Sequence, residues 1–118
     1  MDARFRRDHR LNLKSDFTRV FKRSHRSADR LFVVLARNGA SGSPRLGMAI
    51  SLKATGRAVS RNRIKRLVRE SFRQHRSHLP PLDFVVMARP GVSREPSARI
   101  AESLQAHWNR IAKQCAEL

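Results

Sequence analysis

The chain has 118 residues, a length that suits one domain built around one hydrophobic core. Its formal net charge of +17 repels itself in a compact fold and therefore indicates a polyanionic partner. No stretch approaches the roughly 20 apolar residues of a membrane span, and a single cysteine excludes an internal disulfide and a cysteine-based zinc site. Only five of the 26 basic residues are lysine. Because guanidinium binds phosphate in a bidentate way and stacks on bases, this bias favours structured nucleic acid over anionic lipid, although high genomic G+C content would also produce it.

The N-terminal segment begins with a basic arm. Residues 1–13 are expected to be partly flexible, and they lack the apolar run of a signal peptide, so we expect a cytoplasmic protein. Apolar residues at helical spacing after Ser15, a suitable N-cap, predict a short helix to about Arg23. Residues 24–30 are expected to form a loop.

The middle of the chain predicts a small sheet. Residues 31–36 are nearly all apolar and rich in β-formers, which indicates a strand. Turn signals at 38–44 predict an antiparallel hairpin whose second strand is 45–52. After the stop at Leu79-Pro80-Pro81, a further strand is expected at 83–88.

Two longer helices are expected to pack on this sheet, one from about Ala58 to Gln74 and one from about Ser97 to Ala116. Each has an apolar stripe. The expected buried residues are Val59, Ile64, Leu67, Val68 and Phe72 in the first helix, and Ile100, Leu104, Trp108, Ile111 and Cys115 in the second. This element order predicts a single-domain α+β fold spanning residues 1–118.

The first of these helices carries a row of cations of a single sign. Basic residues recur every four positions along one face: Arg61, Lys65, Arg69 and Arg73. Asn62 and Arg66 widen that face. Like charges at this spacing destabilise a helix by roughly 0.2–0.5 kcal/mol per pair, a cost that bound phosphates would offset. The alternative is a solvated face, which is usual for runs of mixed sign.

The same segment resembles a known family signature. Residues 56–73, GRAVSRNRIKRLVRESFR, are similar to the signature of the bacterial ribonuclease P protein component, which holds RNR, KR and RE at fixed spacing. Weaker matches surround it in the same order, from Arg10-Leu11 to the run DFVVMARPG at 83–91, so that the resemblance covers residues 10 to about 112.

The resemblance implies a fold that the element order permits. It is an α-β sandwich with a mixed sheet of about four strands, three helices and a left-handed βαβ crossover through the arginine helix. Right-handed crossovers are the overwhelming rule, so the residues alone do not predict this hand. Since only three strands are evident, we expect the fourth to be short, such as a split of residues 45–52.

The resemblance also implies a function. The family protein binds a large catalytic RNA, one protein per RNA, and precursor tRNA, and the complex acts as an endoribonuclease that removes the 5′ leader. Mg2+ ions are expected to be held mainly by the RNA. The arginine helix is expected to dock on the RNA subunit. The residues expected in that contact are Arg57, Arg61, Asn62, Arg63, Lys65, Arg66, Arg69 and Arg73.

A second surface, between the first helix and the sheet, is expected to hold the leader. The residues expected there are Arg10, Lys14, Phe17, Phe21 and Lys53. Aromatic rings stack on unpaired bases at roughly 1–3 kcal/mol each without reading sequence, although both rings could instead be core. The family often has a tyrosine on its first strand, where this chain has Val34 or Leu35, and a lysine pair where it has Leu52-Lys53.

No catalytic or metal-binding constellation is evident in the chain itself. The acidic residues are scattered; Glu70 is expected to pair with Arg66 or Arg73, and Asp83 to cap or bridge. His75 and His78 lack a third ligand, and His107 is expected to stand alone. Two alternatives remain open: a ribosomal or other non-catalytic protein that binds structured RNA, and an architectural DNA-binding protein.

Overall fold

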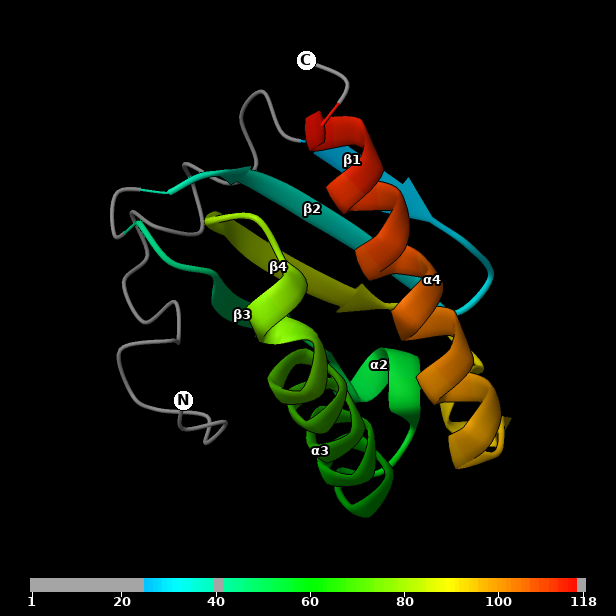
Figure 1. Ribbon diagram of the computed structural model, residues 1–118. Helices are drawn as coiled ribbons and strands as arrows, with labels where there is room; N and C mark the ends of the chain where they lie inside the picture. Colours follow the sequence, from blue (N-terminus) through cyan, green and yellow to red (C-terminus); the bar gives the residue numbers. More distant parts are fainter. Residues whose placement is uncertain (1–24, 40–41, 117–118) are drawn as a thin grey trace.

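The computed structural model describes residues 25–39 and 42–116, and these form a mixed sheet with helices packed on one face (Figure 1). In chain order the elements are β1 (His25–Ala28), β2 (Phe32–Asn38), β3 (Arg45–Ala49), α2 (Leu52–Thr55), α3 (Ala58–His75), η2 (Arg76–His78), β4 (Leu82–Ala88), η3 (Val92–Arg94) and α4 (Ser97–Ala116). The arm predicted at 1–13 and the helix predicted after Ser15 lie outside the described residues. The two long helices, α3 and α4, confirm the predictions for these segments.

The four strands lie in the order β1-β2-β4-β3. β2 runs antiparallel to both β1 and β4, whereas β3 runs parallel to β4. The predicted hairpin of 31–36 with 45–52 is therefore wrong, because β4 lies between its two strands. The burial pattern gives the reason: residues 82–86 of β4 are all buried, as in a central strand, while both ends of β3 are partly open to solvent.

The fourth strand is β1, in a segment predicted to be a loop, and not a split of residues 45–52. Its sequence His-Arg-Ser-Ala carries no apolar alternation, since only Ser27 is buried. After the strand, the Asp29 carboxylate accepts hydrogen bonds from the backbone N–H groups of Leu31 and Phe32, both at 2.8 Å. These bonds close the turn that returns the chain into β2.

The segment after β3 is the short helix α2, so the strand predicted over 45–52 ends early, at Ala49. Ser51 starts α2 by accepting a hydrogen bond from the N–H of Ala54 on its side-chain oxygen. Gly56 ends it with a φ of 86°, a left-handed conformation that favours glycine. The parallel pair β3 and β4 is thus connected through α2 and α3, and the left hand of this crossover stays a prediction.

The hydrophobic core lies between the sheet and the two long helices. Phe72 of α3, Phe84 of β4 and Trp108 of α4 meet edge to face, with ring centroids 5.7 to 5.9 Å apart. The predicted stripe of α4 is buried as expected, with Cys115 partly buried at its end. Val59 was wrongly assigned to the stripe of α3 and is 73% exposed. It precedes Ile64 by five residues, which places it about 140° around the helix.

A buried ion pair ties the two parallel strands together. Arg45 of β3 donates from Nε and Nη2 to the two carboxylate oxygens of Asp83 on β4, each at 2.8 Å. Asp83 therefore bridges, one of the two roles predicted for it. Gly39 approaches this pair so closely that a Cβ built there would lie 2.5 Å from Oδ1 of Asp83. The turn after β2 thus needs glycine at this position.

Candidate RNA interface

Arg61, Lys65 and Arg69 lie on the side of α3 turned away from α4. Ile64, Val68 and Phe72 fix the buried face, and about 100° per residue then places Lys65 and Arg69 beside it. Lys65 is half-buried, and its pKa is lowered by burial and by the neighbouring charges of Arg61 and Arg69. Asn62 and Arg66 point further outward and are exposed.

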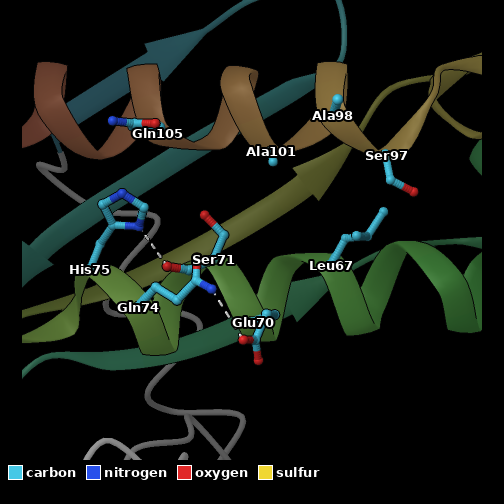
Figure 2. A pocket seen from close by; sticks show the side chains of 9 residues that line it. All are labelled: Leu67, Glu70, Ser71, Gln74, His75, Ser97, Ala98, Ala101 and Gln105. Carbon is cyan, nitrogen blue, oxygen red and sulfur yellow. Dashed lines mark hydrogen bonds between the residues drawn. The ribbon is translucent and has the colours of Figure 1, made fainter.

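The other side of α3 faces α4 and has a different character. An open groove of about 340 Å³ runs between the two helices. Figure 2 shows the side chains that line it, which are mainly small or uncharged. They are Leu67, Glu70, Ser71, Gln74 and His75 from α3, and Ser97, Ala98, Ala101 and Gln105 from α4. Neither lysine nor arginine lines the groove, so the groove and the cationic row occupy separate sides of α3.

Glu70 pairs with Arg73, one of the two partners predicted for it. The Nε of Arg73 donates to Oε2 of Glu70 at 3.1 Å, and Gln74 donates to Oε1 at 3.2 Å. The hydrogen bond from Arg73 is the main reason that the pKa of Glu70 is lowered, and the same bond raises the pKa of Arg73. Arg73 therefore carries a charge that is partly compensated within the chain.

The two arginines of the RNR signature reach backbone carbonyl groups. Nε of Arg61 donates to the carbonyl oxygen of Ile50 at 2.8 Å. Arg63 donates from Nη2 to the carbonyl oxygen of Glu95 at 2.8 Å and to the hydroxyl of Ser97 at 3.1 Å, and from Nη1 to the carbonyl of Ser93 at 3.3 Å. Both side chains are half-buried, whereas Asn62 between them is exposed.

The residues predicted for the leader surface are placed only in part. Arg10, Lys14, Phe17 and Phe21 lie outside the described residues, whereas Lys53 is exposed on α2. On the sheet face opposite the long helices, Leu35 and Val85 form a small apolar cluster with Val33 and Met87. Val34 belongs to the main core instead. Of the two residues considered in place of the family's tyrosine, only Leu35 therefore lies on this face.

Sequence reasoning missed a buried polar cluster around His107. This histidine is fully buried, with Nδ1 2.7 Å from the hydroxyl of Ser27 and Nε2 3.1 Å from Oδ2 of Asp29. The prediction that it stands alone is wrong. Burial lowers the pKa of His107, while Asp29 acts in the opposite direction. A sequence signal existed, since His107 lies three residues after Leu104 and four before Ile111, on the apolar stripe of α4.

Of the two histidines with metal-like spacing, His75 is the last residue of α3 and His78 the last residue of η2. Nδ1 of His75 donates to the carbonyl oxygen of Ser71 at 2.8 Å, and Nδ1 of His78 lies 3.2 Å from the hydroxyl of Ser77. Across residues 25–39 and 42–116, no group of three or more His, Cys, Asp or Glu side chains could hold a metal ion. Within the same ranges, no helix has the length and apolar character needed to cross a membrane.

Comparison with known proteins gives one consistent result. The sequence model of the family described as Ribonuclease P matches residues 5–112. The ribonuclease P protein components of Thioalkalivibrio sulfidiphilus and Nitrosococcus oceani are 47% and 43% identical to the chain. These alignments cover 98% and 96% of this chain and 97% and 95% of those proteins.

Solved structures agree with the sequence comparisons. The RNase P protein of Staphylococcus aureus superposes with a TM-score of 0.79 at 39% identity, over 89% of this chain and 95% of that one. The RNase P protein of Thermotoga maritima, solved in complex with 1-(4-fluorophenyl)-2-thiourea, gives 0.77 at 35% identity, over 86% and 98%. The family resemblance seen in the RNR signature is thus confirmed over nearly the whole length. The chain belongs to the bacterial ribonuclease P protein family and is the protein subunit of ribonuclease P, the endoribonuclease that processes tRNA 5′ ends.

Proposed function

We propose that α3 docks this protein on the catalytic RNA subunit through the residues of the RNR segment. The observation that carries the proposal is the cationic row of α3 away from α4, in which Lys65 and Arg69 are half-buried beside the apolar face and Arg66 is exposed. Clustered cations bind a phosphate backbone because binding releases its condensed counterions. The proposed interface keeps all eight residues of the expectation, some as contacts to the RNA and some as residues that position those contacts. They are Arg57, Arg61, Asn62, Arg63, Lys65, Arg66, Arg69 and Arg73.

Within this set, the exposed members are best placed to touch phosphate. Arg57, Asn62 and Arg66 are exposed. Arg73 forms an ion pair with Glu70 and is therefore expected to contribute less to RNA binding. Arg61 and Arg63 already donate to the protein's own backbone, and we expect them to act mainly through that bonding.

The leader of precursor tRNA is proposed to bind a second surface that includes Arg10, Lys14, Phe17, Phe21 and Lys53. Two aromatic rings four residues apart can stack on unpaired bases of any sequence, as a leader site requires. Lys53 is exposed at the start of α2, where it can meet a phosphate. Separating the two surfaces lets one protein hold its ribozyme and its substrate together.

Residues 1–118 are proposed to act as a single RNA-binding domain in the cytoplasm, with one protein per RNA. A single main core joins the described helices to the sheet, which supports one domain. The Mg2+ ions that the reaction uses are proposed to be held mainly by the RNA, whose phosphates provide the hard oxygen ligands that Mg2+ prefers. The protein's part is then to bind and orient RNA. Family membership decides against the ribosomal and DNA-binding alternatives.

Reconstitution tests this function directly. The full-length chain is mixed with a transcribed bacterial ribonuclease P RNA and precursor tRNA at low magnesium, and 5′ cleavage is followed over time. We expect cleavage to be faster than with RNA alone, because the protein supplies cations that otherwise come from added metal. A rate equal to that of the RNA alone would contradict the proposal.

Two variants separate the two surfaces. Arg66→Gln should weaken binding to the RNA subunit and make its salt dependence shallower by about one unit on the log–log slope. Phe17→Ala should weaken binding of precursor tRNA to the assembled enzyme and leave mature tRNA, which has no leader, unaffected. If Phe17→Ala weakened both tRNAs equally, the leader assignment would be wrong.

A further inference from the structure

The two arginines of the RNR signature bond to segments on two different sides of α3, near its start. Arg61 and Arg63 are two residues apart, so at about 100° per residue their side chains leave the helix some 200° apart. Arg61 reaches the carbonyl of Ile50, in the segment that follows β3. Arg63 reaches the other way, to the segment of residues 93–97 that leads into α4. Asn62, between them, faces solvent.

The first turn of α3 lacks the side chains that usually stabilise a helix start. Its N-cap residue is Arg57, whose side chain makes no capping hydrogen bond, and no acidic residue in the first turn offsets the helix dipole. The cations that follow repel one another, which also disfavours the helix. The bonds from Arg61 and Arg63 hold the first two turns of the helix from two sides. They also place both guanidinium groups on acceptors within the chain.

We propose that Arg61 and Arg63 are positioning residues of the RNA interface. They fix the direction in which α3 presents Asn62 and Arg66, and they do so through backbone carbonyl groups of Ile50, Ser93 and Glu95. The proposal rests on the docking of α3 on the RNA subunit, which the Arg66→Gln variant tests by itself. The contacts of Arg61 and Arg63 then set the orientation of the bound surface, and the charges that face the RNA come from their neighbours.

Arg61 offers a substitution that separates its charge from its hydrogen bond. Glutamine carries its amide nitrogen at the same number of bonds from Cα as Nε of arginine. Arg61→Gln therefore retains a donor for the carbonyl of Ile50 and removes the positive charge, whereas Arg61→Met removes both. Arg63 allows the opposite separation: Arg63→Lys keeps the charge but loses the planar fork that spans Ser93, Glu95 and Ser97.

The experiment measures affinity of each full-length variant for the transcribed catalytic RNA over a range of KCl concentrations, well below the melting temperature. We expect Arg61→Gln to bind within about twofold of the unmodified protein, with an unchanged salt slope. Arg61→Met and Arg63→Lys should each lose roughly tenfold in affinity, also with an unchanged slope, because they misdirect the surface without removing a phosphate contact. Arg66→Gln should lose affinity and about one unit of slope.

Each contrary result has a distinct meaning. An Arg61→Gln slope as shallow as that of Arg66→Gln would make Arg61 a phosphate contact and overturn its positioning role. Arg63→Lys binding as tightly as the unmodified protein would overturn the role of Arg63. Ser103→Ala, remote from α3 and in the buried cluster with Asp29, controls for general destabilisation. If it weakened RNA binding as much as Arg61→Met does, loss of stability would account for the effect and the proposal would fall.

Discussion

A single carboxylate, Asp29, joins three parts of the fold. Its Oδ1 accepts the N–H groups of Leu31 and Phe32, and its Oδ2 accepts the hydroxyl of Ser103 on α4 and lies 3.1 Å from Nε2 of His107. Burial by itself would raise the pKa of Asp29. The hydrogen bonds and the nearby histidine outweigh it and lower the pKa from 3.8 to about 2. The ionised carboxylate is thus the form that the fold requires.

This pKa predicts how stability depends on acid. Because the folded pKa lies below the unfolded value, Asp29 stabilises the fold fully above about pH 4, and this contribution is lost as the pH falls towards 2. With allowance for solvent screening of a partly exposed carboxylate, it amounts to roughly 1 kcal/mol. Asp29→Asn should therefore lower stability at pH 7 by about that much, while stability should fall less steeply between pH 4 and pH 2. Urea denaturation at a series of pH values measures both effects.

A matched control is Glu102→Gln, which removes an exposed carboxylate paired with Arg99 on the surface of α4. It should leave both stability and its acid dependence nearly unchanged, since exposed pairs contribute little. If the two variants had the same stability and the same acid dependence, the hydrogen bonds of Asp29 in the buried cluster would not be the source of its contribution to stability.

At the scale of the elements, the sequence predicted those whose signal is local. Helices α3 and α4 and strand β4 show strong periodicity or continuous apolar runs, and their positions were confirmed. β1 was missed because a short edge strand buries one small polar residue, Ser27, and its pairing with β2 is made by the backbone. The hairpin was wrongly expected because adjacent segments usually pair, whereas here the more apolar β4 takes the central place.

For the candidate interface too, the sequence predicted the features that depend on local spacing and missed those that depend on long-range contacts. The cationic row of α3 follows from four-residue spacing, a property of the helix alone. The bonds of Arg61 and Arg63 could not be predicted, because their acceptors are mainly backbone carbonyls 11 to 32 residues away along the chain. Every residue has a backbone carbonyl group, so the sequence does not show which carbonyls accept these hydrogen bonds. Only the fold brings Ile50 and Glu95 to opposite sides of the same helical turn.

The groove between α3 and α4 offers a prediction about the two sides of α3. Ala101 leaves space beside Leu67 (Figure 2), so Ala101→Leu should bury apolar surface there and raise stability by roughly 0.5–1 kcal/mol. If the RNA binds the cationic side, the same change should leave RNA affinity within about twofold. Thermal unfolding and RNA titration measure the two quantities. Glu102→Leu, which adds a similar side chain to a neighbouring position on α4 outside the groove lining, should not stabilise.

Loss of RNA affinity on Ala101→Leu with gained stability would place RNA on the α4 side of α3. The docking surface would then include the groove, and the assignment to Lys65, Arg66 and Arg69 would need revision. Unchanged affinity, by contrast, would confine the contact to the cationic side.

At the scale of the whole molecule, the net charge of +17 sets how the protein responds to salt. In the free protein, cations such as Arg61, Lys65 and Arg69 lie close together without RNA, and burial together with their repulsion lowers the pKa of Lys65. At 0.15 M ionic strength, charges more than about 8 Å apart are largely screened. Added salt therefore relieves repulsion in the folded state of the free protein.

Added salt has the opposite effect on the complex. Binding releases the counterions condensed on the RNA, and this release is less favourable when the salt concentration is high. Raising KCl from about 50 to 300 mM should raise the melting temperature of the free protein by several degrees, roughly 4 °C for each kcal/mol of repulsion removed. Over the same range the affinity for the RNA subunit should fall by at least about a hundredfold, given several phosphate contacts. Scanning calorimetry of the free protein and filter binding of the complex measure the two trends. A melting temperature that fell with KCl would mean that ion pairs such as Arg45–Asp83 outweigh repulsion in the free protein, and that the excess charge does not strain the fold.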